Sequence, residues 1–268
     1  MMSVMHKLNP RVAFTIVILS FILSALLTTG TYLLLQSNNS SLASSIVLIV
    51  GDIILILPLL LLLIKSDSNI KDVLRLKSVP YPVLSATFIL SIGIVFWADE
   101  LDRLVAIILP PPDWITASVQ NLQADGILSF FLLLIGAVFL AATVEEILFR
   151  GFLQQILEKH WKNVTKGVLV TSLFFALIHL NPWWVIQIYL MGILLGYLAW
   201  KTNSVFPSIL FHAMNNGMAL LYTNWSDKFK GIYEWNGHVS PLLLIMGAFL
   251  VSSGLKKINS INTVPNHA

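Results

Sequence analysis

The sequence predicts an all-α fold: a polytopic transmembrane bundle of about eight membrane helices with both termini in the cytoplasm. Three observations predict it. The chain of 268 residues is 57% hydrophobic and only 11% charged. Its mean hydropathy of +0.83 lies far outside the range of soluble globular proteins. Its apolar runs approach the roughly 20 residues that a membrane helix needs. We expect residues 1–268 to form one integral-membrane domain with no soluble domain appended.

Each apolar run is interpreted as one helix. The first follows two basic residues, but it is too long for a cleaved signal peptide and lacks a small-residue cleavage site, so we expect a retained helix. The fifth run is the shortest. A proline-containing stretch at residues 98–127 is expected to be a non-helical external loop. The expected helices lie near residues 12–35, 44–64, 80–97, 128–158, 167–181, 184–200, 205–222 and 241–255.

The positions of lysine and arginine predict the orientation. With the N-terminus in the cytoplasm, all but three of the 16 basic residues fall on cytoplasmic segments, where membrane proteins carry such an excess. The three outer ones are Arg103, Lys228 and Lys230. The net charge of +3 follows from this bias and from anionic lipids, so the expected partner is the lipid bilayer and not nucleic acid. The chain has no cysteine, which excludes disulfides and thiolate chemistry.

Six polar side chains interrupt the apolar runs in the second half of the chain. Ionised groups at membrane depth cost about 2.5–3.5 kcal/mol each on insertion scales, so they persist where they are used or paired. At 1.5 Å of rise per residue, Glu145, His179, His212 and Asn216 are expected to fall in one layer of the bundle, which the cytoplasm can reach if a cavity opens there. The six side chains are Glu145, Glu146 and Arg150 on the fourth expected helix, His179 on the fifth, and His212 and Asn216 on the seventh.

The spacing of these residues suggests a division of roles. Glu146 and Arg150 are four residues apart, which favours a salt bridge. Glu145 lies about 100° around the helix from Glu146. It is therefore left to face a cavity, where a carboxylate suits general-base chemistry. His212 and Asn216 are also four residues apart, and an imidazole beside an amide is a good pair of donors toward an oxyanion.

Three motifs carry a family resemblance: EExxxR at residues 145–150, FxxxH at 175–179 and HxxxN at 212–216. In this order they resemble the CAAX protease and bacteriocin-processing family (CPBP, also called Abi), which includes the type II CAAX prenyl endopeptidases. The resemblance covers about residues 128–222, the expected catalytic core. It implies an intramembrane endopeptidase that cleaves a peptide or membrane protein, by CAAX-type or bacteriocin and self-immunity processing.

The resemblance also implies a role for each polar residue. The expected roles are water activation for Glu145 and His179, oxyanion stabilisation for His212 and Asn216, and support for Glu146 and Arg150. The family's chemistry is open to two interpretations, as a glutamate protease or as a metalloprotease. One carboxylate and two imidazoles form an acceptable zinc set, but the chain has no HExxH motif. We favour catalysis without an obligatory metal, with a divalent metal such as zinc at Glu145, His179 and His212 as the alternative.

Two functions of other classes also fit a polytopic chain. One is a non-catalytic membrane scaffold or adaptor of the same fold. The other is a transporter with a proton relay, which predicts paired repeats that this chain does not show. The expected location is the bacterial cytoplasmic (inner) membrane, with the site open to the cytoplasmic side.

Two further features stand apart from the motifs. Asp52 lies in the second apolar run with no motif around it, so it is either protonated, paired with another group or functional. Gly192 and Gly196 form a GxxxG pattern, which is typical of close helix packing.

Overall fold

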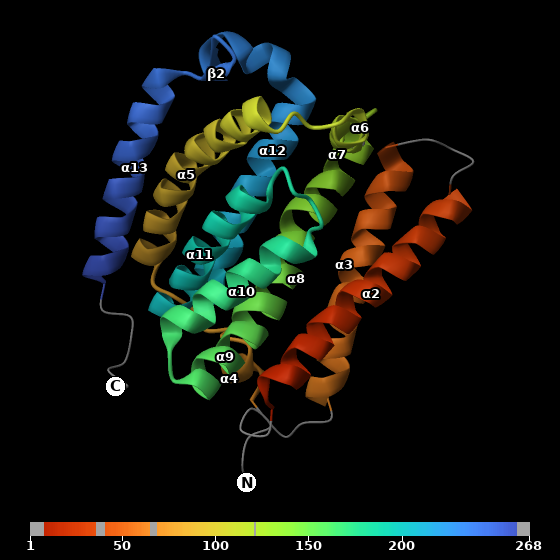
Figure 1. Ribbon diagram of the computed structural model, residues 1–268, viewed down its shortest axis with the longest axis vertical. Helices are drawn as coiled ribbons and strands as arrows, with labels where there is room; N and C mark the ends of the chain where they lie inside the picture. The colour runs from red at the N-terminus through yellow and green to blue at the C-terminus, as the bar shows by residue number, and fades with distance from the viewer. Residues whose placement is uncertain (1–7, 36–40, 65–68, 121, 262–268) are drawn as a thin grey trace.

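Eight long helical segments make up the bundle in the part of the chain that this computed structural model describes, residues 8–35, 41–64, 69–120 and 122–261 (Figure 1). Each corresponds to one of the eight expected runs. They are α2 (Pro10–Leu35), α3 (Ser41–Ile64), α5 (Tyr81–Ile108), the composite α7–α9 (Ile127–Trp161), α10 (Val164–Ile178), α11 (Val185–Thr202), α12 (Phe206–Tyr233) and α13 (Pro241–Ser260).

Six of these segments are long and apolar enough to cross a membrane: α2, α3, α5, α7–α9, α11 and α13. The segment α10 is apolar but has only 15 residues, and α12 carries polar residues along much of its length. The protein is therefore a predominantly helical integral membrane protein, in agreement with the predicted fold class. The number of eight crossings stays a prediction.

The expected external loop at residues 98–127 is mostly helical, so that prediction is wrong. Helix α5 continues through this region to Ile108, and a short helix, α6 (Asp113–Gln120), follows it. The charged residues of this stretch, which favour a loop in the sequence, lie on helix α5 and form an ion pair there. Arg103 Nε lies 3.1 Å from Asp99 Oδ2, one turn away. Likewise, α12 runs to Tyr233 rather than to residue 222.

Short elements close the two ends of the bundle. The four-residue helix α4 (Ile70–Val73) lies at one end. At the other end, β1 (Glu234–Trp235) and β2 (His238–Val239) form an antiparallel hairpin between α12 and α13. Helix α2 begins and α13 ends at the same end of the bundle (Figure 1).

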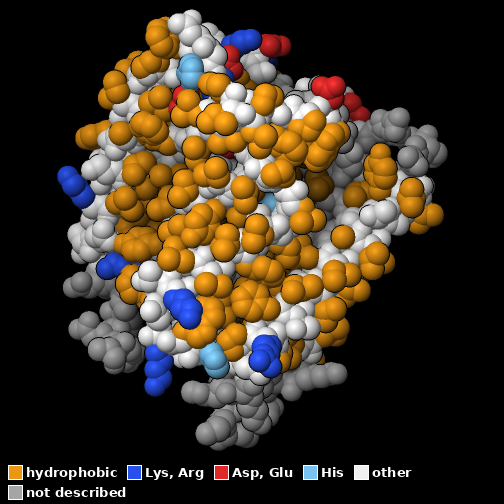
Figure 2. Space-filling model, in the orientation of Figure 1, with side chains coloured by type: hydrophobic (Ala, Val, Ile, Leu, Met, Phe, Trp, Pro, Cys, Tyr) orange, Lys and Arg blue, Asp and Glu red, His pale blue; other side chains and the backbone are white. Residues whose placement is uncertain are grey.

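Charges separate between the two ends of the bundle. Figure 2 shows Lys and Arg side chains over the half of the molecule where α2 begins, red acidic side chains near the opposite end with further basic atoms beside them, and apolar side chains across the face between the two ends. This separation agrees with the predicted sidedness. Lys7, Lys65 and both chain ends, residues 1–7 and 262–268, lie outside the described residues. The cytoplasmic position of the termini therefore stays a prediction.

The composite helix α7–α9 positions the two adjacent glutamates between two stretches of wider winding. A π-helix, η2 (Leu134–Leu140), precedes α8 (Ala141–Glu146), and a second one, η3 (Ile147–Leu153), follows it before α9 (Gln154–Trp161). π-turns inside α-helices are often found at functional sites. Glu145 and Glu146 are thus the last two residues of a short α-helical piece between two π-helices.

The GxxxG pattern packs α11 tightly against its neighbours, as expected. A Cβ atom on Gly192 would lie 3.1 Å from Ser172 Cβ on α10. A Cβ atom on Gly196 would lie 2.8 Å from Gln154 Oε1 on α9. These approaches leave no room for a larger side chain. They bring α10 and α11 against the part of the bundle that carries the glutamates.

Candidate active site

Glu146 and Arg150 form the predicted ion pair in the centre of the bundle. Arg150 Nη1 donates to Glu146 Oε1 over 2.7 Å, and both side chains are fully buried. The same carboxylate oxygen lies 3.0 Å from His212 Nδ1 on α12. Removing either Glu146 or Arg150 would leave an uncompensated buried charge. The contact between Glu146 and His212 joins α12 to the composite helix.

The guanidinium group of Arg150 has two further contacts. Its Nη2 donates to the carbonyl oxygen of Gly192 on α11 over 3.3 Å. Its Cζ lies 4.3 Å from the centroid of the Phe175 ring on α10, within the range of a cation–π interaction. The arginine therefore joins α10, α11 and η3 behind the glutamates. Phe175, the first residue of the FxxxH motif, thus packs against this buried cation.

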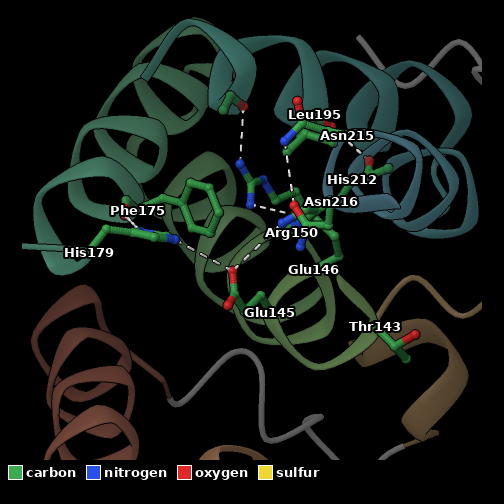
Figure 3. A network of polar contacts seen from close by, with 12 residues as sticks. Thr143, Glu145, Glu146, Arg150, Phe175, His179, Leu195, His212, Asn215 and Asn216 are labelled. Carbon is green, nitrogen blue, oxygen red and sulfur yellow. Dashed lines mark hydrogen bonds and ion pairs between the residues drawn. The ribbon is translucent and has the colours of Figure 1, made fainter. Parts of the chain in front are cut away.

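Glu145 lies on another side of α8 and faces two imidazole rings. Its Oε2 is 3.9 Å from His179 Nε2 and 4.0 Å from His212 Nε2. Figure 3 shows the rings of His179 from α10 and His212 from α12 approaching this carboxylate from two directions. The Glu145 side chain is 15% exposed, whereas that of Glu146 is completely buried. Glu145 is therefore the accessible carboxylate of the two, as the sequence predicts.

His179 does not lie within its helix, contrary to the expected boundary of 167–181. Helix α10 ends at Ile178, and His179 is its C-terminal cap residue. Its Nδ1 lies 2.6 Å from the carbonyl oxygen of Phe175, one turn earlier. Because a carbonyl oxygen only accepts, this contact places a proton on Nδ1 and turns Nε2 toward Glu145.

The hydrogen-bond partners assign the same tautomer, with the proton on Nδ1, to the rings of His179 and His212. Nδ1 of His212 faces the Glu146 carboxylate, so it carries a proton, and its Nε2 also faces Glu145. In the neutral form of each ring, Nε2 is then an acceptor. Three acceptor atoms, two imidazole nitrogens and one carboxylate oxygen, therefore converge without a donor between them. Glu145 Oε2 has no hydrogen-bond partner among the described residues.

The distances in this cluster suit a bridging water better than direct hydrogen bonds. A water that donates to two acceptors at about 2.8 Å each holds them roughly 4–4.5 Å apart. The two gaps beside Glu145 are 3.9 and 4.0 Å. The site is thus shaped to receive a small donor of two hydrogen bonds.

Asn216 lies one turn beyond His212 on α12 and makes contacts of a different kind. Its Nδ2 donates to the carbonyl oxygen of Ala137 in η2 over 3.0 Å. Its Oδ1 accepts from Nδ2 of Asn215 over 3.4 Å. The amide is therefore held by η2, next to the site, and keeps one N–H that these contacts do not use.

The cluster of Glu145, His179 and His212 does not have the geometry of a metal site. Among the described residues, no group of three or more His, Cys, Asp and Glu side chains is arranged to hold a metal ion. The 3.9 and 4.0 Å separations exceed the roughly 3.3 Å expected between two ligands that bind one zinc ion at about 2.0–2.1 Å. These separations are wider than one zinc ion requires, and a metal at Glu145, His179 and His212 stays a prediction.

Fold and site together define a class: a helical integral membrane protein with a cluster of carboxylate, imidazole and amide groups inside the bundle. Residues 127–218 match the family described as type II CAAX prenyl endopeptidase, Rce1-like. The match covers roughly a third of the chain, from the start of α7 into α12, and includes all six predicted site residues. Residues 127–218 are thus similar to this family of CAAX-type endopeptidases, which confirms the resemblance found in the sequence. No curated protein and no solved structure matches the chain.

Proposed function

We propose that this protein is an intramembrane endopeptidase that hydrolyses a peptide bond of a membrane-associated or hydrophobic substrate. One observation carries the proposal above all: two imidazole nitrogens from α10 and α12 face the same oxygen of Glu145, at 3.9 and 4.0 Å. This arrangement can hold a water molecule against a general base. The family of residues 127–218 supplies the reaction class.

In the proposed reaction, Glu145 activates the water. The water oxygen forms a bond to the carbonyl carbon of the peptide, one water proton passes to the Glu145 carboxylate, and the electron pair of the C=O double bond moves onto the oxygen. When the tetrahedral intermediate collapses, the C–N bond breaks and Glu145 returns the proton to the leaving amine. His179 accepts the second hydrogen of the water through Nε2 and so orients the attack.

His212 and Asn216 are proposed to stabilise the oxyanion. The Glu146 carboxylate lies 3.0 Å from Nδ1 of His212 and so turns Nε2 of this ring into the site, where it donates to the oxyanion when it carries a proton. Asn216 offers the amide N–H that Ala137 leaves unused. Donors aimed at a developing oxyanion are worth about 10²–10³ in rate each. Glu146 and Arg150 act through His212 and through the packing of the helices.

The proposed substrate follows from the family match, and the proposed membrane sidedness follows from the charge distribution. CAAX-type processing is what the family name describes, and processing of a bacteriocin leader or a self-immunity protein is the alternative. We propose a bacterial cytoplasmic membrane, with the site reached from the end of the bundle where the basic side chains gather (Figure 2). The positive-inside rule supports this sidedness.

The test compares membrane and secreted peptides from cells that express the wild type, Glu145→Gln or Thr143→Val at equal levels. Thr143 is the matched control because it lies on α8 but points away from the site (Figure 3). The wild type and Thr143→Val should release the same peptides in equal amounts. Glu145→Gln should release about 10²–10⁴-fold less of them, because that variant lacks the general base.

The other outcomes separate the alternatives. Identical peptide profiles for all three proteins, with any cellular phenotype retained by Glu145→Gln, would favour the scaffold and overturn the protease. Membranes treated with a zinc chelator form a further arm. Peptide release that survives chelation supports water activation by Glu145 alone. Release that is lost and then restored by zinc would assign the reaction to a metalloprotease.

A further inference from the structure

Asp52 lies on α3, outside the segment that matches the family, yet it faces the site. One turn before it, Ile49 Cγ1 lies 3.0 Å from the position that a Cβ atom on Gly136 of η2 would occupy. One turn after it, Leu55 belongs to the same buried core cluster as Val144 of α8. Asp52 is therefore on the face of α3 that packs against η2 and α8, at the level of the glutamates.

Glu145 is the charged side chain available to Asp52. The elements packed against α3 are α2, α7, η2 and α8, and their described residues carry three charges: Arg11, Glu145 and Glu146. Arg11 is distant, because the α2 residues beside Gly51 are Thr28 and Ser24, and even Ser24 lies 13 residues and about 20 Å along the helix from Arg11. Glu146 is already paired with Arg150.

The two remaining carboxyl groups, those of Asp52 and Glu145, are close enough to repel each other electrostatically when both are ionised. Both also lack partners: Asp52 Oδ2 and Glu145 Oε2 are buried oxygens with no hydrogen bond among the described residues. Two neighbouring carboxylates without a cation cannot both stay ionised in an apolar setting at acceptable cost. One proton held between them removes the repulsion and satisfies both oxygens.

We propose that Asp52 is a positioning residue of the active site: its carboxyl group keeps a proton and donates a hydrogen bond to Glu145 through one bridging water. The bond holds the Glu145 carboxylate in place opposite the two imidazoles. The charge stays on Glu145 because the water that fits between its Oε2 and the two imidazoles donates a further hydrogen bond to this oxygen. The catalytic part of this inference rests on the proposed protease function, whereas the contact itself does not.

The first test detects the proton and needs no substrate. Infrared spectra of the purified protein at neutral pH should contain the C=O stretch of a protonated carboxyl group. Asp52→Asn should abolish this band, and Glu145→Gln should shift it, because the acceptor changes. Ser45→Ala is the control, since Ser45 is a buried residue on the same helix, and it should leave the band unchanged. A band that survives Asp52→Asn unaltered would overturn the proposal.

The second test uses the released peptides and separates positioning from packing. Asp52→Asn keeps a hydrogen-bond donor and should retain release within about threefold of the wild type. Asp52→Leu keeps the volume but loses the donor, so release should fall by about 10–100-fold, and the acid limb of its pH profile should move to higher pH. Equal release by Asp52→Leu and the wild type would overturn the positioning role.

The two tests fail in different ways. If the wild type releases no peptide, the protease proposal fails, while the infrared band still decides whether Asp52 and Glu145 share a proton. If peptides are released but the band and the Asp52→Leu rate are unaffected, the protease stands and Asp52 is not part of its site. If Asp52→Asn lowers peptide release as much as Asp52→Leu does, the hydrogen-bond donor is not what matters, and Asp52 contributes to packing alone.

Discussion

The two sides of α8 place the same side chain in opposite electrostatic surroundings. On one side, Glu146 is fully buried and receives Arg150 at 2.7 Å and His212 at 3.0 Å. On the other side, Glu145 is partly exposed, and its Oε2 has no hydrogen-bond partner among the described residues. The paired side stabilises the bundle, while the unpaired side keeps an acceptor free for chemistry. Perturbed, unsatisfied ionisable groups are typical of functional sites for this reason.

The paired side extends beyond Glu146 toward the basic end of the bundle. Arg75 and Glu158 form a second buried ion pair there. Gln154 donates to Glu158 over 2.8 Å and to the carbonyl oxygen of Gly196 over 2.9 Å. Both glycines of the GxxxG pattern thus accept a hydrogen bond from the composite helix through their carbonyl oxygens. The small residues serve polar contacts as well as close packing.

The sharpest test of this comparison makes the same change on each side. Glu146→Gln leaves the buried Arg150 without a counter-charge, so the free energy of unfolding should fall by about 3–5 kcal/mol. Glu145→Gln removes no ion pair with a permanent cation and should change it by less than about 1 kcal/mol. Thermal unfolding of both variants in one detergent measures the difference.

A double variant sharpens the result. Glu146→Gln combined with Arg150→Met removes both charges and should recover part of the loss, because no buried charge is then left unpaired. Equal losses with Glu145→Gln and Glu146→Gln would show that the two sides of α8 do not differ in the way described.

The second prediction concerns the glycine that accepts from Arg150. Gly192→Ala places a Cβ atom 3.1 Å from Ser172 Cβ and 3.3 Å from Arg150 Nη2. Overpacking of this kind should lower the free energy of unfolding by about 1–3 kcal/mol. Gly231→Ala in α12 is the matched control, because nothing lies within 4 Å of its added Cβ. The control should be neutral or gain about 0.5 kcal/mol from helix propensity. A neutral Gly192→Ala variant would mean that α11 can move away without loss.

The smallest effect on stability is expected where α5, α12 and the hairpin meet. Here Arg103 and Tyr222 donate hydrogen bonds to Glu234, and we call this group the polar cap. The hydrogen bond from the Tyr222 hydroxyl, with that from Arg103 beside it, lowers the pKa of Glu234 from its ordinary 4.5. A carboxylate with a lower pKa in the folded state adds stability above its unfolded pKa, and the contribution disappears as pH falls through the folded value. Solvent screens this partly exposed group, so the contribution is about 0.5 kcal/mol or less.

The measurement at the cap is a difference between two proteins. Unfolding temperatures of the wild type and Glu234→Gln, recorded from pH 7 to pH 3, should converge at the acid end. The gap should be widest near neutral pH. A gap that widens as the pH falls would reverse the sign and refute this assignment.

Helical periodicity and depth account for the part of the site that the sequence could predict. The four-residue spacing predicted the Glu146–Arg150 pair, and equal rise along antiparallel helices predicted that His179 and His212 would meet Glu145. Neither argument needs long-range information. The Glu145–Glu146 division of roles follows from the 100° step between neighbours.

Features that depend on distant partners were missed. Helix α5 was expected to end near residue 97, because its charged residues have partners far along the chain: Arg103 pairs with Glu234, and Glu100 lies 2.8 Å from His238. The neighbour of Asp52 is likewise 93 positions away. The π-helices on either side of α8 have no residue pattern that would have predicted them.

The short helices beside the site have a consequence for the surrounding lipid. Helices α10 and α11 contain 15 and 18 residues, or about 22 and 27 Å of rise, against a hydrocarbon core of roughly 30 Å. A span shorter than the bilayer is accommodated by local thinning of the membrane. For two spans of this length we expect the leaflet over the α10–α11 connection, immediately after His179, to be thinner than the surrounding bilayer. Lipids with shorter acyl chains should relieve this mismatch, so bilayer thickness is expected to influence how the proposed site is exposed.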